Sequence, residues 1–246
     1  MSVRLSAAGG WAAPSPLTEG TEIFGLTPGA GPLAVDAERA RTASLDVSTT
    51  RGPLELSGTL FASRITNPVG LRRTAGDHGT TLAFVNAAGP AIAHGGELFA
   101  IYNQKPVIVT AFYASTRTRE VSAETGRVRE SPYVPRQTAA LDVAFDEDES
   151  GIGVGVEAFY TGAQALDDNP YRSVAPGFVT LGLLASKRMR LSTIYLNFEN
   201  LTNVRQDRFD PVRRPAGSVG EGGRHTVDAW APLDGRMMNA GVRLRQ

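Results

Sequence analysis

Three histidines and no cysteine leave this sequence with few residues for metal or nucleophilic chemistry. His78, His94 and His225 lack the i, i+4 spacing of a helical metal site, and without cysteine there is no thiolate zinc site, iron–sulfur cluster or cysteine nucleophile. The glycine-rich stretch 151–156 ends in Val156, where a dinucleotide-binding fingerprint needs glycine. The sequence therefore predicts no enzyme, no metal and no cofactor.

Polar residues that could bind a ligand gather in two long segments, 162–176 and 203–235, both rich in turn-forming residues. Segment 203–235 contains five arginines and five carboxylates, so its charge is balanced and it is not simply an anion-binding site. Such loops could bind a ligand, pair with anionic lipopolysaccharide, or fold against each other through Arg–carboxylate pairs. The expected substrate-facing residues are Asp167, Asp168, Asn169, Tyr171, Arg172, Arg205, Arg208 and Arg213.

Period-two alternation separated by turn signals predicts an all-β protein. We expect ten strands, at 2–9, 41–50, 54–65, 91–103, 106–119, 136–146, 151–161, 177–187, 190–200 and 236–245. The connections alternate between tight turns, at 51–53, 104–105, 148–150 and 187–189, and long loops, at 10–40, 66–90, 120–135, 162–176 and 201–235. Because every second connection of an up-and-down antiparallel sheet lies on the same edge, this sorting indicates such a sheet.

Four of these strands separate into an apolar and a polar face. At the best register, all 15 residues of one face, from Leu141 to Leu244, are apolar or aromatic, whereas five of the 16 on the other face are charged. A membrane barrel needs an uncharged lipid-facing side. A soluble sheet with one solvent-exposed face shows the same alternation of apolar and polar residues. In a barrel, this polar face would point toward the lumen. The expected lumen-facing residues are Asp142, Glu157, Tyr195, Asn197, Glu199 and Arg243.

The composition excludes further classes of protein. The 246 residues carry 25 Lys+Arg and 25 Asp+Glu, and this balance argues against a nucleic-acid binder. No apolar run approaches the roughly 18 residues of a membrane helix, whereas the strands of a membrane barrel alternate and escape such a scan. Residues 1–5 show no basic segment before an apolar one, so no secretory signal is visible.

Several stretches resemble the C-terminal part of a TonB-dependent outer-membrane receptor, most densely over 157–245. Segment 157–164 resembles an ascending strand and loop of that family, and 196–205, with Glu199-Asn200-Leu201, is similar to its penultimate strand. Segment 229–236 leads into 238–244, which resembles the closing strand. Upstream, 84–98 and 37–46 resemble two further strands, so the resemblance covers most of the chain.

The resemblance implies an antiparallel up-and-down transmembrane β-barrel, of which this chain is a partial wall of about ten strands. Family members have about 22 strands around an N-terminal plug, whose TonB box couples to the inner-membrane energy complex, and take up a ferric siderophore, cobalamin or a sugar. We expect residues 1–246 to be a C-terminal part that lacks the plug and N-terminal strands and does not transport alone.

The resemblance also implies a setting for the chain. The expected location is the bacterial outer membrane, with lipid and lipopolysaccharide around the sheet. The missing half of the receptor and its plug would be partners, and the TonB complex would be reached only through that plug. Uptake of an unknown small-molecule ligand would depend on loops 66–90, 120–135, 162–176 and 203–235.

Two other hypotheses stay open. A small outer-membrane hydrolase with about ten strands would group His94 or His225 with Asp167 or Asp168 at the barrel rim. A surface β-sandwich adhesin would pack two sheets face to face around a dry core. The receptor hypothesis instead predicts a curved open sheet, or a small strained barrel, whose apolar side is covered by lipid.

Overall fold

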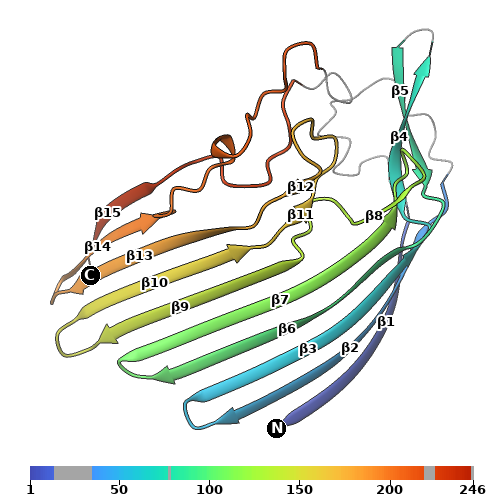
Figure 1. The fold of residues 1–246 in the computed structure, drawn as a ribbon. Helices are drawn as coiled ribbons and strands as arrows, with labels where there is room; N and C mark the ends of the chain where they lie inside the picture. The colour runs from blue at the N-terminus through green and yellow to red at the C-terminus, as the bar shows by residue number, and fades with distance from the viewer. Residues whose placement is uncertain (14–34, 77–78, 219–224, 245–246) are drawn as a thin grey trace.

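The computed structural model describes residues 1–13, 35–76, 79–218 and 225–244 and shows one curved, open antiparallel sheet (Figure 1). Its ten main strands are β1 (Ser2–Ala12), β2 (Glu38–Arg51), β3 (Leu54–Thr66), β6 (Ala91–Gln104), β7 (Val107–Val121), β9 (Gln137–Glu147), β10 (Ile152–Thr161), β13 (Phe178–Arg188), β14 (Ser192–Glu199) and β15 (Met237–Leu244). They pair in this order, and β1 and β15 form the two edges. No helix among the described residues is long and apolar enough to cross a membrane.

The observed strands confirm the predicted up-and-down sheet. All ten predicted strands are present, with ends that differ from the predicted ones by three residues or fewer. The four tight turns lie at one end of the sheet, and the long connections lie at the other (Figure 1). We call these the turn end and the loop end.

The loop end contains short strands where the sequence analysis expects only loops. A hairpin of β4 (Val69–Gly76) and β5 (Gly79–Asn86) lies within 66–90, so the expectation of a loop there is wrong. Its alternation is obscured because glycines occupy the second and last positions of β4 and the first position of β5. Smaller pairs join β8 (Val128–Arg129) to β7, and β11 (Gln164–Ala165) to β12 (Val174–Ala175). Parts of the predicted loops 10–40 and 203–235 lie outside the described residues.

The cross-strand register places apolar residues of neighbouring strands on one face, which we call the apolar face. Val156 in β10 lies between Val143 in β9 and Leu183 in β13, and Leu183 lies opposite Phe198 in β14. Each of the ten main strands has an exposed large side chain on this face, for example Leu60 at 62% and Val242 at 61%.

No second layer of protein covers the apolar face in the described part of the chain. Only four hydrophobic residues are buried there, and three of them, Ala175, Val227 and Trp230, belong to the loop end and not to the sheet. The dry core that a β-sandwich requires is therefore missing from the described structure. Transfer of such a face from water to hydrocarbon is favourable by about 25 cal/mol per Å² of apolar surface, so the face suits a lipid environment.

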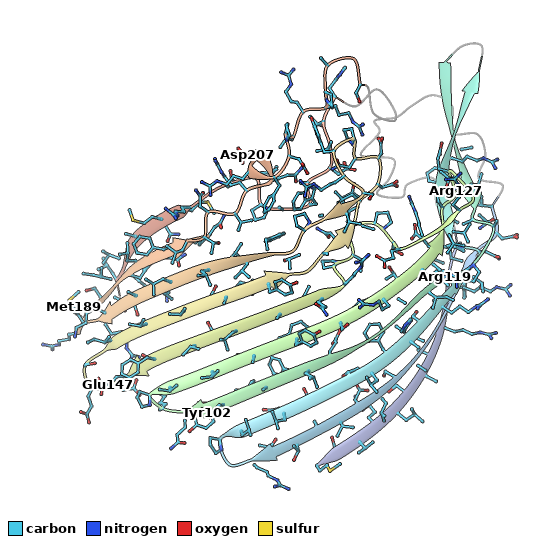
Figure 2. The ribbon with its side chains drawn as sticks, in the orientation of Figure 1. Tyr102, Arg119, Arg127, Glu147, Met189 and Asp207 are labelled. Atoms are coloured by element: carbon cyan, nitrogen blue, oxygen red, sulfur yellow. The ribbon has the colours of Figure 1, made fainter. Side chains whose placement is uncertain are left out.

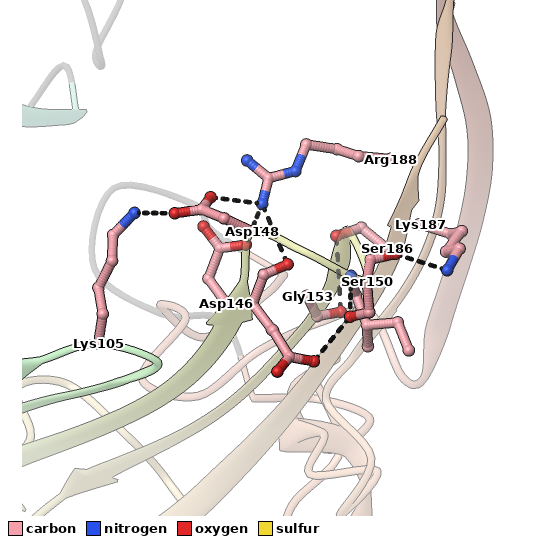
Figure 3. A network of polar contacts seen from close by, with 10 residues as sticks. Lys105, Asp146, Asp148, Ser150, Gly153, Ser186, Lys187 and Arg188 are labelled. Atoms are coloured by element: carbon pink, nitrogen blue, oxygen red, sulfur yellow. Dashed lines mark hydrogen bonds and ion pairs between the residues drawn. The ribbon is translucent and has the colours of Figure 1, made fainter. Parts of the chain in front are cut away.

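Charged side chains connect neighbouring turns at the turn end (Figure 3). Lys105, in the β6–β7 turn, donates from Nζ to Oδ2 of Asp148, in the β9–β10 turn, at 2.6 Å. Arg188, at the end of β13, donates from Nη2 to Asp148 Oδ1 at 3.0 Å and to Asp146 Oδ1 at 2.9 Å. This turn network spans β6 to β13 on the solvent-exposed rim of the sheet.

We expect the turn network to make a pH-dependent contribution to stability. Hydrogen bonds and charge from Lys105, followed by Arg188, lower the pKa of Asp148 below its ordinary 3.8. A carboxyl with a lowered folded-state pKa stabilises the fold above its ordinary pKa, and this effect is lost as the pH falls through the lowered pKa. Asp148→Asn should therefore reduce stability at pH 7 and reduce it less at pH 2, as unfolding curves at both pH values would measure. An equal loss at both would contradict the assignment.

A tyrosine ring packs over a glycine in the last strand pair. Tyr195 in β14 lies opposite Gly241 in β15. A Cβ atom added to Gly241 would lie 2.5 Å from the Tyr195 hydroxyl oxygen and 2.6 Å from its Cζ. The ring thus occupies the space that the missing side chain leaves, as aromatic residues do beside glycines in curved sheets.

Candidate functional site

Arg129 ties two connections together at the loop end. The short β8–β7 pairing holds Arg129 opposite Glu120. Arg129 Nε donates to Glu120 Oε1 at 2.9 Å, and Nη1 donates to Asp167 Oδ1 at 2.8 Å. Burial lowers the pKa of the Arg129 guanidinium, but the carboxylates of Asp167 and Glu120 together outweigh burial, so the pKa is raised. Arg129 therefore stays charged and fixes the position of Asp167.

Tyr133 places a phenol between two acidic residues. Its hydroxyl oxygen lies 3.0 Å from the carbonyl oxygen of Asp167 and 3.2 Å from Asp228 Oδ2, and its one proton can be donated to either. Burial, followed by the charge of Asp228, raises the pKa of Tyr133 to about 12. Tyr133 is therefore a hydrogen-bond donor at physiological pH and not a phenolate.

A cavity of about 290 Å³, which we call the loop cavity, opens beside these residues. Its apolar wall includes Val69 and Val121. Its charged and phenolic lining comprises Glu120, Glu124, Arg129, Tyr133, Asp167 and Asp228. Four carboxylates against one guanidinium favour a ligand with hydroxyl or amide donors or positive charge. Among the described residues, no three His, Cys, Asp or Glu side chains form a group that could hold a metal ion.

A buried tryptophan fixes the long connection between β14 and β15. The Trp230 side chain packs with its ring centroid 5.2 Å from that of Phe209 and 5.7 Å from the guanidinium carbon of Arg172. Arg172 in turn donates from Nη2 to Oδ1 of the buried Asp210 at 2.7 Å. This contact joins the connection that contains β11 and β12 to the connection after β14.

Two buried glutamines hold the backbone around Trp230. The Gln206 side chain accepts the backbone N–H of Trp230 at 2.8 Å through Oε1 and donates to the Asp228 carbonyl at 3.2 Å through Nε2. Gln164 Nε2 donates to the Trp230 carbonyl at 2.9 Å. Since Asp228 lines the loop cavity, one wall of the cavity depends on this arrangement. We call Gln164, Arg172, Gln206, Asp210 and Trp230 the loop anchor.

Most of the predicted substrate-facing residues contact other loop residues. Asp167 lines the loop cavity, and the other seven are not among its lining residues. Asp168 Oδ2 accepts from Arg214 Nη2 at 2.7 Å, in an ion pair whose arginine side chain is only 5% exposed. Asn169 Oδ1 accepts the Tyr171 N–H at 2.9 Å and stabilises a turn.

The remaining predicted loop residues show the same pattern. The Tyr171 hydroxyl donates to the carbonyl of Arg213. Arg205 Nε lies 3.4 Å from Asp207 Oδ1, and Arg208 Nη1 donates to the Asn203 carbonyl at 3.3 Å. These contacts fold the loops against each other, which is one of the three roles that the sequence left open. A ligand role for these residues stays a prediction.

Most residues that line the loop cavity are not among the site residues predicted from the sequence. Glu120, Arg129 and Tyr133 lie in the predicted loop 120–135 and Asp228 lies about a hundred residues later, and no motif joins them. The signal for Tyr133 was its place between Pro132 and Pro135, which restrict the backbone on both sides.

The six predicted lumen residues all lie on the face opposite the apolar face. Asp142 in β9 lies directly opposite Glu157 in β10. Asn197 Nδ2 donates to Glu199 Oε1 at 2.8 Å. Tyr195 lies opposite Gly241, and Arg243 lies opposite Thr193. That these residues line a transport path stays a prediction.

Comparisons with known proteins identify the fold. The structure is similar to an FrpB iron transporter from Neisseria meningitidis (18% identity, TM-score 0.68, 98% of this chain and 36% of that chain). It is also similar to the copper transporter OprC (15% identity, TM-score 0.69, 98% and 36%). A third likeness is to the ferric yersiniabactin uptake receptor FyuA from Yersinia pestis (18% identity, TM-score 0.66, 98% and 34%). The chain therefore spans about a third of the length of these receptors.

The sequence itself matches a family model. A search of the curated proteins found no match. The comparisons support neither the hydrolase nor the adhesin hypothesis, since the proteins found are transporters and receptors. The model described as "TonB dependent receptor-like, beta-barrel" matches residues 1–201, including the upstream strands whose resemblance was less dense. Because this match covers most of the chain, the protein belongs to the TonB-dependent receptor β-barrel family and forms a partial, ten-strand wall of that barrel.

Proposed function

We propose that the chain supplies part of the wall and the ligand-facing loops of an outer-membrane receptor for energy-coupled uptake of a scarce nutrient. The observation that carries this proposal is the open sheet with an exposed apolar face, which corresponds to about a third of such receptors. The plug, the remaining strands and the contact with TonB would be supplied by sequence outside this chain. The wall alone would not transport.

A ferric siderophore or related metal chelate is the proposed class of nutrient. The similar structures are named as an iron transporter, a copper transporter and a ferric yersiniabactin uptake receptor, which supports this class. Pockets for whole small molecules measure about 300–1,000 Å³, so the loop cavity of about 290 Å³ would hold only part of a siderophore. Its carboxylates and phenol suit the hydroxyl and amide groups of such a ligand rather than a bare metal ion.

Uptake by cells tests the proposal as a whole. Cells that lack their own siderophore receptors would produce the complete receptor containing this chain, with and without a functional TonB complex, and uptake of radioactive iron from a panel of ferric siderophores would be measured. We expect that at least one ferric siderophore is taken up and that this uptake requires a functional TonB complex. Uptake that persists without TonB, or no uptake of any chelate, would contradict the proposal.

Tyr133 gives a sharper test of the loop cavity. In the complete receptor, Tyr133→Phe should weaken ligand binding about 5- to 30-fold, because loss of one hydrogen bond in a polar site costs about 1–2 kcal/mol. Tyr102→Phe is the matched control, since Tyr102 lies at the turn end and bonds only Gln104 among the described residues. Equilibrium binding of the transported chelate measures both. Equal affinities for the two variants would remove Tyr133 from the ligand site.

A further inference from the structure

Basic side chains, five of them arginines, gather on the apolar face at the loop end of β2, β3, β6 and β7. They are Arg39, Arg41, Arg64, His94, Arg117 and Arg119, all exposed. The register brings them close together: Arg41 lies directly opposite Arg64, and His94 lies directly opposite Arg117. Ile92 alone separates Arg64 from Arg119. Figure 2 shows Arg119 at the loop end of β7. We call this group the arginine patch.

The arginine patch has no counter-charge within the described part of the chain. None of the ion pairs there involves an arginine of the patch. The apolar face of β1, β2, β3, β6 and β7 carries no aspartate or glutamate at any paired position. Since like charges directly opposite each other on a sheet are destabilising, the pair Arg41–Arg64 calls for an anion that the described residues do not supply.

The position of the arginine patch along the strands fits the surface of a membrane. In β2, the residues on the apolar face between Arg41 and Arg51 are Ala43, Leu45, Val47 and Thr49, all uncharged. Ten residues correspond to about 34 Å along a strand, or about 25 Å across a membrane at the usual barrel tilt, which is the height of the apolar band of such barrels. The patch therefore lies where lipid headgroups begin.

The patch is local and does not form a ring around the wall. The apolar-face positions nearest the loop end in β9, β10 and β13 are Gln137, Tyr160 and Val179, none of which is charged. A general attraction to an anionic membrane surface would spread cations over all strands. Concentration on four neighbouring strands instead indicates one binding site.

A hollow lies directly beside the directly opposed arginines. Its volume is about 690 Å³, and Arg41 and Arg64 are among its lining residues. The strand residues of the apolar face that line it are mostly small, namely Ala7, Gly9, Ala43 and Ala62, together with Ile92. Small side chains leave room for a hydrocarbon chain next to two guanidinium groups.

We propose that the arginine patch binds the phosphate groups of a phosphorylated glycolipid of the outer leaflet, of the lipopolysaccharide type, with one acyl chain in the hollow. Guanidinium groups bind phosphate through paired N–H donors. The charge pattern supplies the phosphate site, and the adjoining hollow distinguishes a lipid from a free anion or an acidic protein. The proposal rests on the proposed function only in placing the chain in an outer membrane.

The test compares two charge-matched double variants of the complete receptor. Arg41→Gln/Arg64→Gln removes the opposed pair, whereas Arg51→Gln/Arg190→Gln removes two exposed arginines at the turn end. Binding of detergent-solubilised receptor to bisphosphorylated lipid A would be measured, with the same lipid lacking both phosphates and with inorganic phosphate as competitor. We expect the first variant to bind lipid A about 30-fold more weakly, from about 1 kcal/mol for each basic residue, and the control to bind as the unmodified receptor does.

A variant that keeps the charge tests the hollow. Ala43→Phe fills it, retains both arginines, and should weaken lipid A binding while competition by inorganic phosphate is unchanged. Equal binding of the phosphate-free lipid, equal loss in both double variants, or a co-purifying protein that replaces the lipid would overturn the proposal. Lipid A binding by a receptor that imports no chelate would contradict only the proposed function, and chelate import without phosphate-dependent lipid binding would contradict only the arginine patch.

Discussion

Replacement of Val143 by arginine should reduce the folding free energy of the receptor barrel by about 2–4 kcal/mol, the penalty for an arginine on the lipid face at the middle of the membrane. Val143 lies in the centre of β9, opposite Val109 in β7 and Val156 in β10, on the apolar face. Val143 is 38% exposed, and no second layer formed by the described residues covers it. The new charge would therefore meet hydrocarbon.

The next residue supplies the control. Ala144 lies on the opposite face, between Ile108 and Gly155, so Ala144→Arg places the same charge at nearly the same depth but toward the lumen. Denaturant unfolding of both variants in lipid vesicles, in the complete receptor, measures the difference. Equal losses of stability would mean that lipid does not cover the apolar face, and the assignment of the wall would fail with it.

Removal of the Trp230 side chain should destabilise the connection between β14 and β15 by about 3–5 kcal/mol, the usual range for a buried tryptophan cut to alanine. Trp230 is 5% exposed and contacts both Phe209 and Arg172. Its loss would free Asp228, whose carbonyl is held by the neighbouring Gln206. Ligand affinity should therefore fall although Trp230 is not a lining residue of the loop cavity.

Hydrogen exchange can separate this local effect from a failure of the barrel. The amides of Arg214 and Val227 donate to the carbonyls of His225 and Val212, both at 2.9 Å, within this connection. In Trp230→Ala these amides should lose protection while β9 and β10 keep theirs, and Trp230→Phe should preserve much of it because a ring remains beside Arg172. Unchanged protection of Arg214 and Val227 would show that the loop anchor does not hold the connection.

The strands could be predicted from the sequence because each is specified locally. The alternation of Val143, Val156 and Phe198 with polar neighbours follows the pleat of the sheet, and tight turns such as 51–53 carry glycine and proline. The β4–β5 hairpin has no such contrast between faces, so its pairing is not visible in the pattern of residue types. The shape of the sheet followed from the family resemblance and from the sorting of the connections.

The loop cavity could not be predicted because its residues meet only in three dimensions. Tyr133, Asp167 and Asp228 come from three connections, and their proximity depends on Arg129 and the loop anchor. Composition predicted arginines and carboxylates in these loops but not which ones pair. The arginine patch was likewise hidden, because Arg41 and Arg64 become neighbours only when the β2–β3 register is known.

The packing of Tyr195 over Gly241 has a consequence for assembly. A shift of β15 by two residues along β14 would bring Asn239 or Arg243 opposite the ring, and the space needed there would be filled by a side chain. A shift by one residue would turn Val242 toward the lumen and Arg243 toward lipid. Because only glycine fits beneath the Tyr195 ring, this contact favours a single alignment of β15 on β14. The two neighbouring alignments are disfavoured by steric overlap or by exposure of a charge, so the contact specifies the register as the wall assembles.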